Sequence, residues 1–275
     1  MKIQNMTIQN IVDGILEYHP SIGDGRTCDV IIGGDPYVEC TGILVSIAPT
    51  VEIVRKAIEI GANFVFVHEP TFYSGYDDEC EWLKGNDVYE EKLKLLVDNG
   101  IVIYRDHDHI HAHKPDGIFY YLLKQLGWLE YVVPGEGHAP EIKLPETTLG
   151  DLINHIKKAM ELETIRYIGN LDAKVSTVGF CGHLLPNDQT NWSNNDQVAA
   201  SWKYDVVIPG EIVEWTLPLY IQDAVMLGKT KGMIIPGHFI QEEAGMRWAV
   251  EWLRPIVGDK LPMTFVSAGD MFHYM

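Results

Sequence analysis

Apolar residues in the first third of the chain follow two different spacings. Residues 42–47 (GILVSI) form a short apolar run bounded by turn residues, which is typical of a buried strand. Residues 50–60 (TVEIVRKAIEI) carry apolar side chains at helical spacing, and Thr50 and Gly61 suit the two ends of a helix. Residues 63–68 (NFVFVH) form a second apolar strand. A strand, a helix and a strand in this order predict a βαβ unit with parallel strands and a right-handed crossover.

The same alternation of strand and helix continues along the rest of the chain. Residues 88–98 are predicted as a helix that ends at Asn99-Gly100, residues 101–106 as a strand and residues 117–126 as a further helix. Later segments with these spacings are predicted as strands at 177–182, 204–209, 232–237 and 262–267 and as helices at 216–227 and 239–253. Strands that alternate with helices indicate the α/β class with mostly parallel sheets.

The predicted elements divide into two lobes separated by a region of different composition. Residues 128–175 include a stretch rich in Pro, Gly and Glu followed by a short helix at 149–161, and we interpret this range as a connector. Residues 1–127 then form a first α/β lobe and residues 176–275 a second one, packed closely enough that the whole chain can also be counted as one domain. Within the second lobe, the polar and turn-rich residues 185–197 predict a surface loop.

The charge balance restricts the kind of partner. The 275 residues include 39 acidic and 21 basic side chains, which gives a formal net charge of −18. Nucleic-acid binding depends on neutralisation of phosphates by Lys and Arg, so a DNA or RNA partner is disfavoured. No apolar run approaches the roughly 18–20 residues of a membrane span. The first residues, MKIQNMTIQN, lack the apolar core of a signal peptide, and we therefore expect a cytoplasmic protein without a membrane partner.

Two further classes of site find little support in the sequence. The four cysteines, Cys28, Cys40, Cys80 and Cys181, are scattered without a CxxC pair, which disfavours a disulfide framework and a structural zinc ribbon. Neither G-x-G-x-x-G nor G-x-x-x-x-G-K-[ST] opens any predicted helix. A dinucleotide- or nucleotide-binding domain of those two types is therefore not expected.

Histidines follow three separate predicted strands at their carboxyl ends. His68 ends one strand, the four histidines of DHDHIHAH (106–113) follow a second, and His238 lies just beyond a third. In open α/β sheets, ligands bind at the carboxyl ends of the strands, near the point where the strand order reverses. Imidazole is a common ligand of divalent transition metals. The convergence of three strand ends therefore predicts a metal site in a cleft at the carboxyl ends of the strands.

Each of these groups has an alternative explanation when it is considered alone. His68 and Glu69 could form a charged surface turn. In extended conformation, the period of two would place the four histidines of 106–113 on one face, but a solvated polar loop or adventitious metal affinity would explain them as well. His238 and Glu242 are four residues apart, which places both on one face of a helix, whereas Glu242 could instead serve the helix N-terminus electrostatically.

Five segments spread over nearly the whole chain match the motifs of one known family. They are GILVSIAPTVEIVRKAIEIGANFVFVHEPTF (42–72), His107–His111, IPGE (208–211), GHFIQEE (237–243) and SAGD (267–270). On these segments the chain resembles the NIF-three-like family, which is often labelled as a type-two GTP cyclohydrolase. The resemblance implies a NIF-three-like fold of two α/β lobes, two divalent metal ions in the cleft between them, and assembly into homo-oligomers that are often toroidal hexamers.

The metal motifs of that family are matched here with two exchanges. The family has two adjacent histidines before a proline, where this chain has His68 followed by Glu69. The family then has a histidine followed four residues later by an aspartate, where this chain has His107 and His111. One histidine and one carboxylate have therefore changed places, which conserves the number of ligands and their net charge and favours a working site.

The C-terminal motif of the family is matched without change by His238 and Glu242. The resemblance therefore implies the metal ligands His68, Glu69, His111, His238 and Glu242. A set of nitrogen and oxygen ligands without a thiolate suits Zn, Fe, Mn, Ni or Co, and the sequence does not choose among these metals.

This ligand set leads to two alternative functions. A pair of metal ions lowers the pKa of a bridging water and stabilises both oxygens of a displacement reaction, so one hypothesis is a metal-dependent hydrolase for a small phosphate- or heterocycle-containing substrate. In that hypothesis Glu69 or Glu242 bridges the ions, and His107 or Glu243 acts as the catalytic general base. The alternative is a non-catalytic metal-binding protein with a regulatory or scaffold role.

Overall fold

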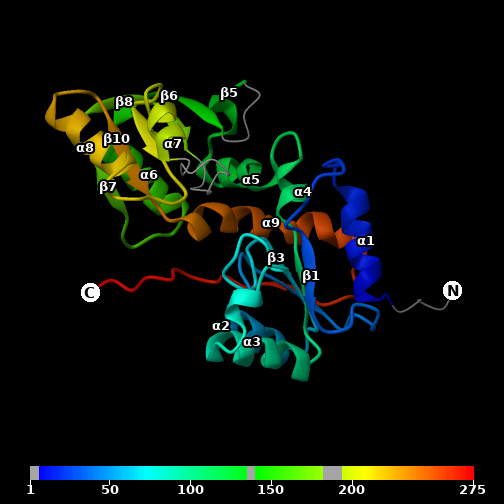
Figure 1. Ribbon diagram of the computed structural model, residues 1–275. Coiled ribbons are helices and arrows are strands. Elements are labelled where there is room, and N and C mark those ends of the chain that lie inside the picture. The colour runs from blue at the N-terminus through cyan, green and yellow to red at the C-terminus, as the bar shows by residue number, and fades with distance from the viewer. Residues whose placement is uncertain (1–5, 135–139, 182–193) are drawn as a thin grey trace. The chain divides into compact units, whose positions relative to one another are not determined.

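The chain forms two compact units, each with one sheet and its own helices, in the computed structural model (Figure 1). The structure describes residues 6–134, 140–181 and 194–275. Unit 1 consists of Met1–Ile118 and Glu242–Met275, and unit 2 consists of Phe119–Gln241. The α/β class is confirmed, and the residues from Glu242 onward group with unit 1, which differs from the predicted division into lobes.

Unit 1 is built around a five-stranded sheet with the order β1-β4-β3-β2-β11. Its strands are β1 (Val30–Gly33), β2 (Ile43–Val45), β3 (Phe64–Val67), β4 (Val102–Arg105) and β11 (Met263–Phe265). The strands β11, β2, β3 and β4 pair in parallel, and β1 pairs with β4 in the antiparallel direction. Because β3 and β4 are parallel neighbours, the residues that follow both strands lie at the same edge of the sheet.

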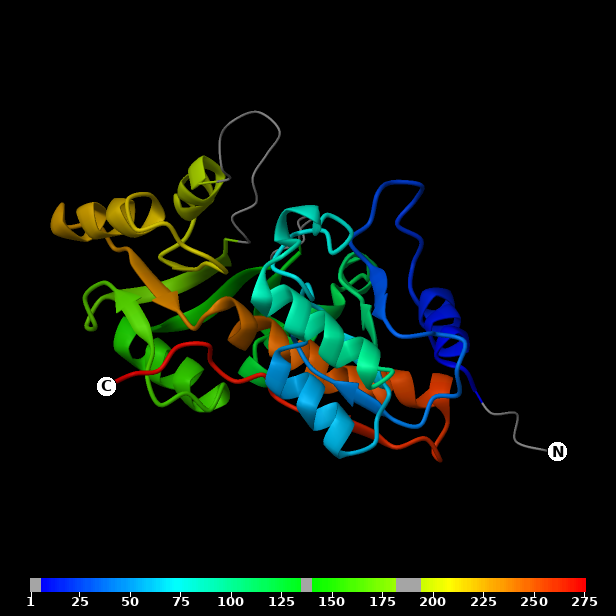
Figure 2. The same cartoon turned by 60° about the horizontal axis from the view of Figure 1, so that its bottom comes forward.

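Helices cover both faces of this sheet. The helical segments of unit 1 are α1 (Ile8–Tyr18), α2 (Val51–Glu59), η1 (Glu81–Leu83), α3 (Asp87–Asp98), α4 (Asp108–His111) and the part of α9 (His238–Val257) from Glu242 onward. Figures 1 and 2 show α2 and α3 side by side on one face. There, Val65 of β3 joins a buried core with Ile53 of α2 and Leu96 of α3. The predicted βαβ unit is thus confirmed by β2, α2 and β3.

The opposite face of the sheet packs against α1 and α9. Successive side chains of a strand point to opposite faces, so Phe66 points away from the core that contains Val65. Its ring centroid lies 5.7 Å from that of Trp252 in α9. Gly14 allows α1 to approach α9 closely, because a Cβ atom at this position would lie 2.7 Å from a side-chain carbon of Ile256. The four side chains of β3 are therefore buried on both faces, as an apolar run without alternation predicts.

Unit 2 contains a six-stranded sheet with the order β5-β6-β8-β9-β10-β7. Its strands are β5 (Val132–Val133), β6 (Glu141–Thr148), β7 (Arg166–Ile168), β8 (Lys174–Phe180), β9 (Val206–Ile208) and β10 (Gly232–Ile235). Its helices are α5 (Gly117–Leu126, from Phe119 onward), η2 (Leu129–Tyr131), α6 (Leu149–Ala159), α7 (Asn194–Ser201) and α8 (Leu217–Met226).

The two sheets differ in the direction of their strands. Parallel pairing dominates unit 1, whereas unit 2 pairs β8-β9-β10 in parallel and β5-β6, β6-β8 and β10-β7 in the antiparallel direction. Buried and more exposed residues alternate in the first part of β6, as in a strand with one solvated face. The range 128–175, which we interpreted as a connector, therefore supplies β5, β6 and β7 to the sheet as well as α6.

Two further expectations concern the surface of the chain. Most of the predicted loop at 185–197 lies outside the described residues, and its last residues, 194–197, form the start of α7 instead. None of the described helices combines the length and the apolar character that are needed to cross a bilayer.

Candidate metal centre

Potential metal ligands gather in unit 1 at the edge where β3 and β4 end. Within the described residues, four sets of His, Cys, Asp or Glu side chains have ligand atoms within 4.8 Å of one another, and all four lie in unit 1. Two of the sets share His68. One consists of His68, His107 and His111, and the other of His68, Glu69 and Glu242. The structure thus brings together four of the five predicted ligands, and it adds His107, which was predicted as a general base.

His68 is held rigidly at the end of a fully buried strand. Its backbone N–H donates to the carbonyl oxygen of Ile47 at 3.1 Å, and its own carbonyl accepts from Arg105 Nε at 3.0 Å. Its Nδ1 lies 2.9 Å from the carbonyl oxygen of Asp106. Because a carbonyl only accepts, Nδ1 carries the hydrogen and Nε2 is left with the lone pair. This is the tautomer that a metal ligand needs.

The surroundings of His68 Nε2 fit a metal ion. The side chain is fully buried, and Nε2 has no regular hydrogen-bond partner among the described residues, although it lies 3.2 Å from Glu242 Oε2. Two ligand atoms that each lie about 2.1 Å from one tetrahedral zinc ion are roughly 3.4 Å apart. The separation of these two atoms is therefore suited to a shared metal ion.

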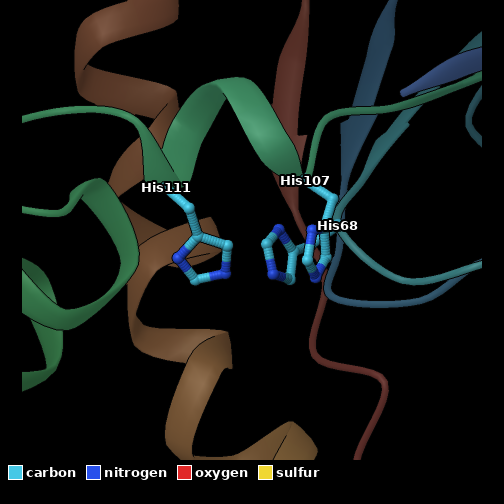
Figure 3. Close-up of side chains that lie close together, drawn as sticks. All are labelled: His68, His107 and His111. Carbon is cyan, nitrogen blue, oxygen red and sulfur yellow. The ribbon is translucent and has the colours of Figure 1, made fainter. Parts of the chain in front are cut away.

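The two other histidines of the site lie on a helical turn. The N–H of His111 donates to the carbonyl of His107 at 3.2 Å, which places both side chains on one face of α4. Their ring centroids are 4.9 Å apart, and that of His68 lies 4.5 Å from His107 and 4.9 Å from His111. Figure 3 shows the three rings converging from β3 and α4.

The helical turn corrects the expectation that residues 106–113 are extended. Asp29, which precedes β1, accepts the N–H groups of His107 and Asp108 at 2.7 Å each and that of His109 at 3.1 Å. A carboxylate that binds the first N–H groups of a helix stabilises the helical turn. His109 turns toward Asp29, and its Nδ1 lies 2.5 Å from Asp29 Oδ2. The site therefore contains two of the four histidines of this segment.

Two carboxylates that the sequence analysis did not identify orient these ligands. Asp116 Oδ2 lies 2.8 Å from Nδ1 of His111, and Asp108 Oδ1 lies 3.0 Å from Nδ1 of His107. Each carboxylate binds one ring nitrogen and leaves Nε2 directed elsewhere, as carboxylates behind metal-bound histidines do. The short distance in sequence to a candidate histidine was the available signal for both residues.

Electrostatics keep the site suited to a cation. Burial, followed by the charge of His68, lowers the pKa of His107, and the hydrogen bond to Asp108 offsets only part of this effect. His107 is therefore neutral at neutral pH, as a ligand must be. Burial also lowers the pKa of His68, but Glu242 and Glu69 raise it more, so that its pKa is raised in sum. Buried negative charge around His68 thus favours a positively charged partner.

A thiol lies next to the site. Cys28, His107 and Asp108 form a third cluster, in which Cys28 Sγ lies 3.4 Å from Asp108 Oδ1. Burial, with further contributions from the charges of Asp108 and Asp29, raises the pKa of Cys28 to about 12. Without a metal ion the thiol therefore stays protonated at neutral pH. The predicted set of nitrogen and oxygen ligands does not include this thiol.

The remaining predicted site residues have other partners. His238 belongs to unit 2, where its Nδ1 is paired with Glu211. Glu243 accepts a hydrogen bond from Ser267 Oγ at 2.8 Å and another from the N–H of Ala268 at 2.9 Å. Its carboxylate thus holds the C-terminal segment of unit 1.

Sequence comparison relates almost the whole chain to one family. The family model for Duf34/NIF3 (NGG1p interacting factor 3) matches residues 6–268. The GTP cyclohydrolase 1 type 2 homolog of Clostridium perfringens is 23% identical over 183 residues, which cover 63% of this chain and 68% of that protein. Further curated relatives of the same name are matched over 54% and 30% of their own length, so the chain spans about half of them or less.

Solved structures share the fold over nearly their full length. The Staphylococcus aureus protein SA1388 has a TM-score of 0.73 at 18% identity, over 99% of this chain and 100% of that one. A Bacillus cereus protein related to NIF3 has a TM-score of 0.72 at 16% identity, over 98% of this chain and 99% of that one. At sequence identities of 16–18%, this similarity shows a shared fold and nothing further.

Proposed function

This chain belongs to the Duf34/NIF3 (NGG1p interacting factor 3) family, and from that premise we propose that unit 1 holds a dinuclear centre of divalent transition-metal ions. The observation that carries the proposal is the position of His68, which belongs to two sets of clustered ligand atoms at once. Because the ring of His68 offers a single Nε2, it can bind only one ion directly. The carboxylates of Glu69 and Glu242 lie close enough to that nitrogen to act as further ligands.

Different residues of the site would bind such ions, orient the ligands and supply negative charge. His107 and His111 present ring nitrogens from one face of α4, and Asp116 fixes the orientation of His111. Glu69 and Glu242 supply negative charge that offsets part of the charge of two divalent cations. His238, which the family motifs imply as a further ligand, belongs to unit 2, where Glu211 is bound to its Nδ1. Zn, Fe, Mn, Ni and Co all suit this set of ligands.

Hydrolysis of a small phosphate- or heterocycle-containing substrate is the activity that we propose for this centre. A dinuclear centre supplies, when bound, a water of lowered pKa and positive charge for the transition state. Glu69 and Glu242 would hold the ions, and His107 or Glu243 would act as the general base for an attacking water. The curated relatives carry the name GTP cyclohydrolase 1 type 2 homolog, which supports the inclusion of GTP among the substrates to be tested.

A non-catalytic metal-binding scaffold is the second candidate, and one observation favours it. Both residues proposed as general base are engaged in other contacts. His107 lies within a ligand set, and Glu243 binds Ser267 and Ala268. A centre without an available base would bind metal and leave substrates unchanged. The expected cytoplasmic location and assembly into homo-oligomers, up to a toroidal hexamer, stay predictions under both functions.

Metal content and turnover together test these proposals. Untagged protein is reconstituted with Zn, Mn or Fe, and the metal is counted by elemental mass spectrometry in wild type, Glu242→Gln and Glu251→Gln. Glu251 lies exposed on the same helix and serves as the matched control. We expect Glu242→Gln to lose about one ion per chain, because a carboxylate ligand becomes a neutral amide, and Glu251→Gln to equal wild type.

The loaded protein is then assayed with GTP, phosphate esters and cyclic amides. Turnover that disappears in Glu242→Gln and persists in Glu251→Gln would support the hydrolase. Bound metal without turnover of any of these substrates would favour the scaffold. Equal metal content in all three proteins would contradict the dinuclear centre.

A further inference from the structure

A second group of potential ligands lies beside the centre described above and shares no residue with it. Asp29, Asp106 and His109 offer ligand atoms within 4.8 Å of one another. Asp29 precedes β1 and Asp106 follows β4, and these strands pair in the antiparallel direction with Val30 opposite Arg105. The two aspartates are therefore the next residues along the paired strands. Like charges directly opposite each other on paired strands are destabilising, and a cation between them would offset the repulsion.

Asp106 has an unsatisfied oxygen inside this group. The residue is fully buried, and its Oδ2 lies 2.9 Å from Nε2 of His19. Its Oδ1 is also buried and has no hydrogen-bond partner in the part of the chain that the structure describes. A buried carboxylate oxygen that has lost its water is costly unless a donor or a cation replaces that water.

The hydroxyl of Tyr104 gives an independent indication. It is buried and has no hydrogen-bond partner within residues 6–134, 140–181 and 194–275. Arg105 does not pair with Asp29 or Asp106, because its guanidinium donates to the carbonyl oxygens of His68 and Gly75. In the part of the chain that the structure describes, no hydrogen bond from Lys or Arg offsets the charge of Asp29 or Asp106.

We propose that Asp29, Asp106 and His109 bind a divalent transition-metal cation at a site separate from the dinuclear centre. Two carboxylates and one imidazole form a nitrogen and oxygen set that suits Zn, Mn, Fe or Co. His109 binds the ion as the neutral imidazole. Its Nδ1 then no longer forms a hydrogen bond with Oδ2 of Asp29, and each of the two residues bonds to the ion instead. His19 acts as a positioning residue that holds Oδ2 of Asp106, and His113 lies 2.7 Å from the other nitrogen of His19.

The position of this cation gives it a supporting role. Asp29 binds the N–H groups at the start of α4, and the carbonyl of Asp106 accepts from His68 Nδ1. A cation that fixes both aspartates would therefore fix the segments that present His68, His107 and His111. If the hydrogen bond to His19 alone satisfies Asp106, no ion is bound here, and a count of bound zinc distinguishes the two cases.

Zinc binding to the metal-free, untagged full chain tests the proposal. Zinc is counted by elemental mass spectrometry after equilibration at fixed free zinc, in wild type, His109→Gln and His273→Gln. His273 is an exposed histidine of the C-terminal segment and controls for adventitious binding. We expect His109→Gln to lose about one ion per chain and His273→Gln to match wild type. Circular dichroism in the presence of chelator checks that both variants fold.

A second background separates this proposal from the dinuclear centre. The ion that depends on His109 is expected to remain in Glu242→Gln, which removes a ligand of the other site. His19→Gln is expected to keep that ion at saturating zinc and to weaken its binding by roughly 10- to 100-fold, as the loss of a supporting residue does. The proposal is overturned by equal zinc in wild type and His109→Gln in both backgrounds, or by wild type that binds no zinc.

Discussion

The two units of the chain place similar residues at the ends of similar strands, yet among the described residues only unit 1 contains a set of ligands by itself. In unit 1, the parallel neighbours β3 and β4 are followed by His68 and by the segment 106–111. In unit 2, the parallel neighbours β9 and β10 are followed by Glu211 and His238, which pair directly with each other. All clusters of three potential ligands found within the described residues belong to unit 1.

The difference shows what a strand end needs in order to become a metal site. In unit 1, Asp29 folds the segment after β4 into a helical turn, and α9 returns Glu242 to the same edge. Each strand end thereby gains ligands from segments that are distant in the sequence. The parallel strands bring the first ligands to one edge of the sheet. The segments that pack beside those strands add the further ligands that a metal ion needs.

The largest effect should separate His68 from His238. We expect His68→Asn to weaken metal binding by more than the roughly 100-fold that the loss of a supporting residue can cause, because this ring serves both ligand sets of the centre. We expect His238→Asn to leave the metal affinity of unit 1 within about 10-fold of the wild-type value. Competition with a chromophoric chelator measures both affinities. Equal losses in the two variants would remove the distinction between the units.

Removal of the metal should destabilise one unit more than the other. A ligand that binds only the folded state, at a free concentration of about 100 times its dissociation constant, stabilises that state by about 2.7 kcal/mol. We expect chelation to lower the hydrogen-exchange protection of amides in β3 and β4 by about this amount and to leave β9 and β10 within about 0.5 kcal/mol. Equal loss of protection in both sheets would indicate that the metal stabilises the whole chain uniformly.

A smaller effect is expected from the carboxylate behind His111. Asp116→Asn replaces a charged acceptor of the ring by a neutral one, and we expect metal affinity to fall by roughly 10- to 100-fold. Asp205→Asn in unit 2 is the matched control, because Asp205 accepts the N–H groups of Ser176 and Thr177 away from any ligand set. It should lower stability and leave metal affinity unchanged. Unchanged affinity in Asp116→Asn would show that His111 needs no such orientation.

The smallest effects should be equal in the two units. Thr50 caps α2 in unit 1, and Thr148 caps α6 in unit 2, each through a hydroxyl that accepts a backbone N–H at 3.2 Å and 3.0 Å. Substitution of either threonine by alanine should lower the free energy of unfolding by about 1 kcal/mol. Metal content should stay at the wild-type value. Loss of metal in Thr50→Ala alone would mean that the site depends on the packing of α2.

The sequence predicts the helices and strands of this fold better than it predicts which of them pack or pair with one another. Apolar runs identify β2, β3 and β4 to within a few residues, because fully buried strands carry no polar alternation to confuse them. The strand β6 is not recognised, since EIKLPETT includes a proline and several charges. Nothing local indicates that β11, near the C-terminus, pairs with β2 in unit 1. That contact depends on packing over more than two hundred residues.

The candidate site follows the same rule. His68, Glu69, His111 and Glu242 are found through strand ends and family motifs, and the structure brings their side chains together. The helical turn at α4 is missed because the carboxylate that stabilises it, Asp29, is separated from His109 by 80 residues. The role of Glu243 in holding Ser267 and Ala268 is missed for the same reason.

Anomalous diffraction from crystals of the zinc-loaded, untagged protein tests the central claim most directly. The account predicts an anomalous peak at the zinc absorption edge, about 2.1 Å from His68 Nε2. The other protein ligands of that ion are expected to be either Glu242 or the pair of His107 and His111. A second peak within about 4 Å of the first would establish the dinuclear centre. Zinc-loaded crystals without a peak in contact with His68 would contradict the account.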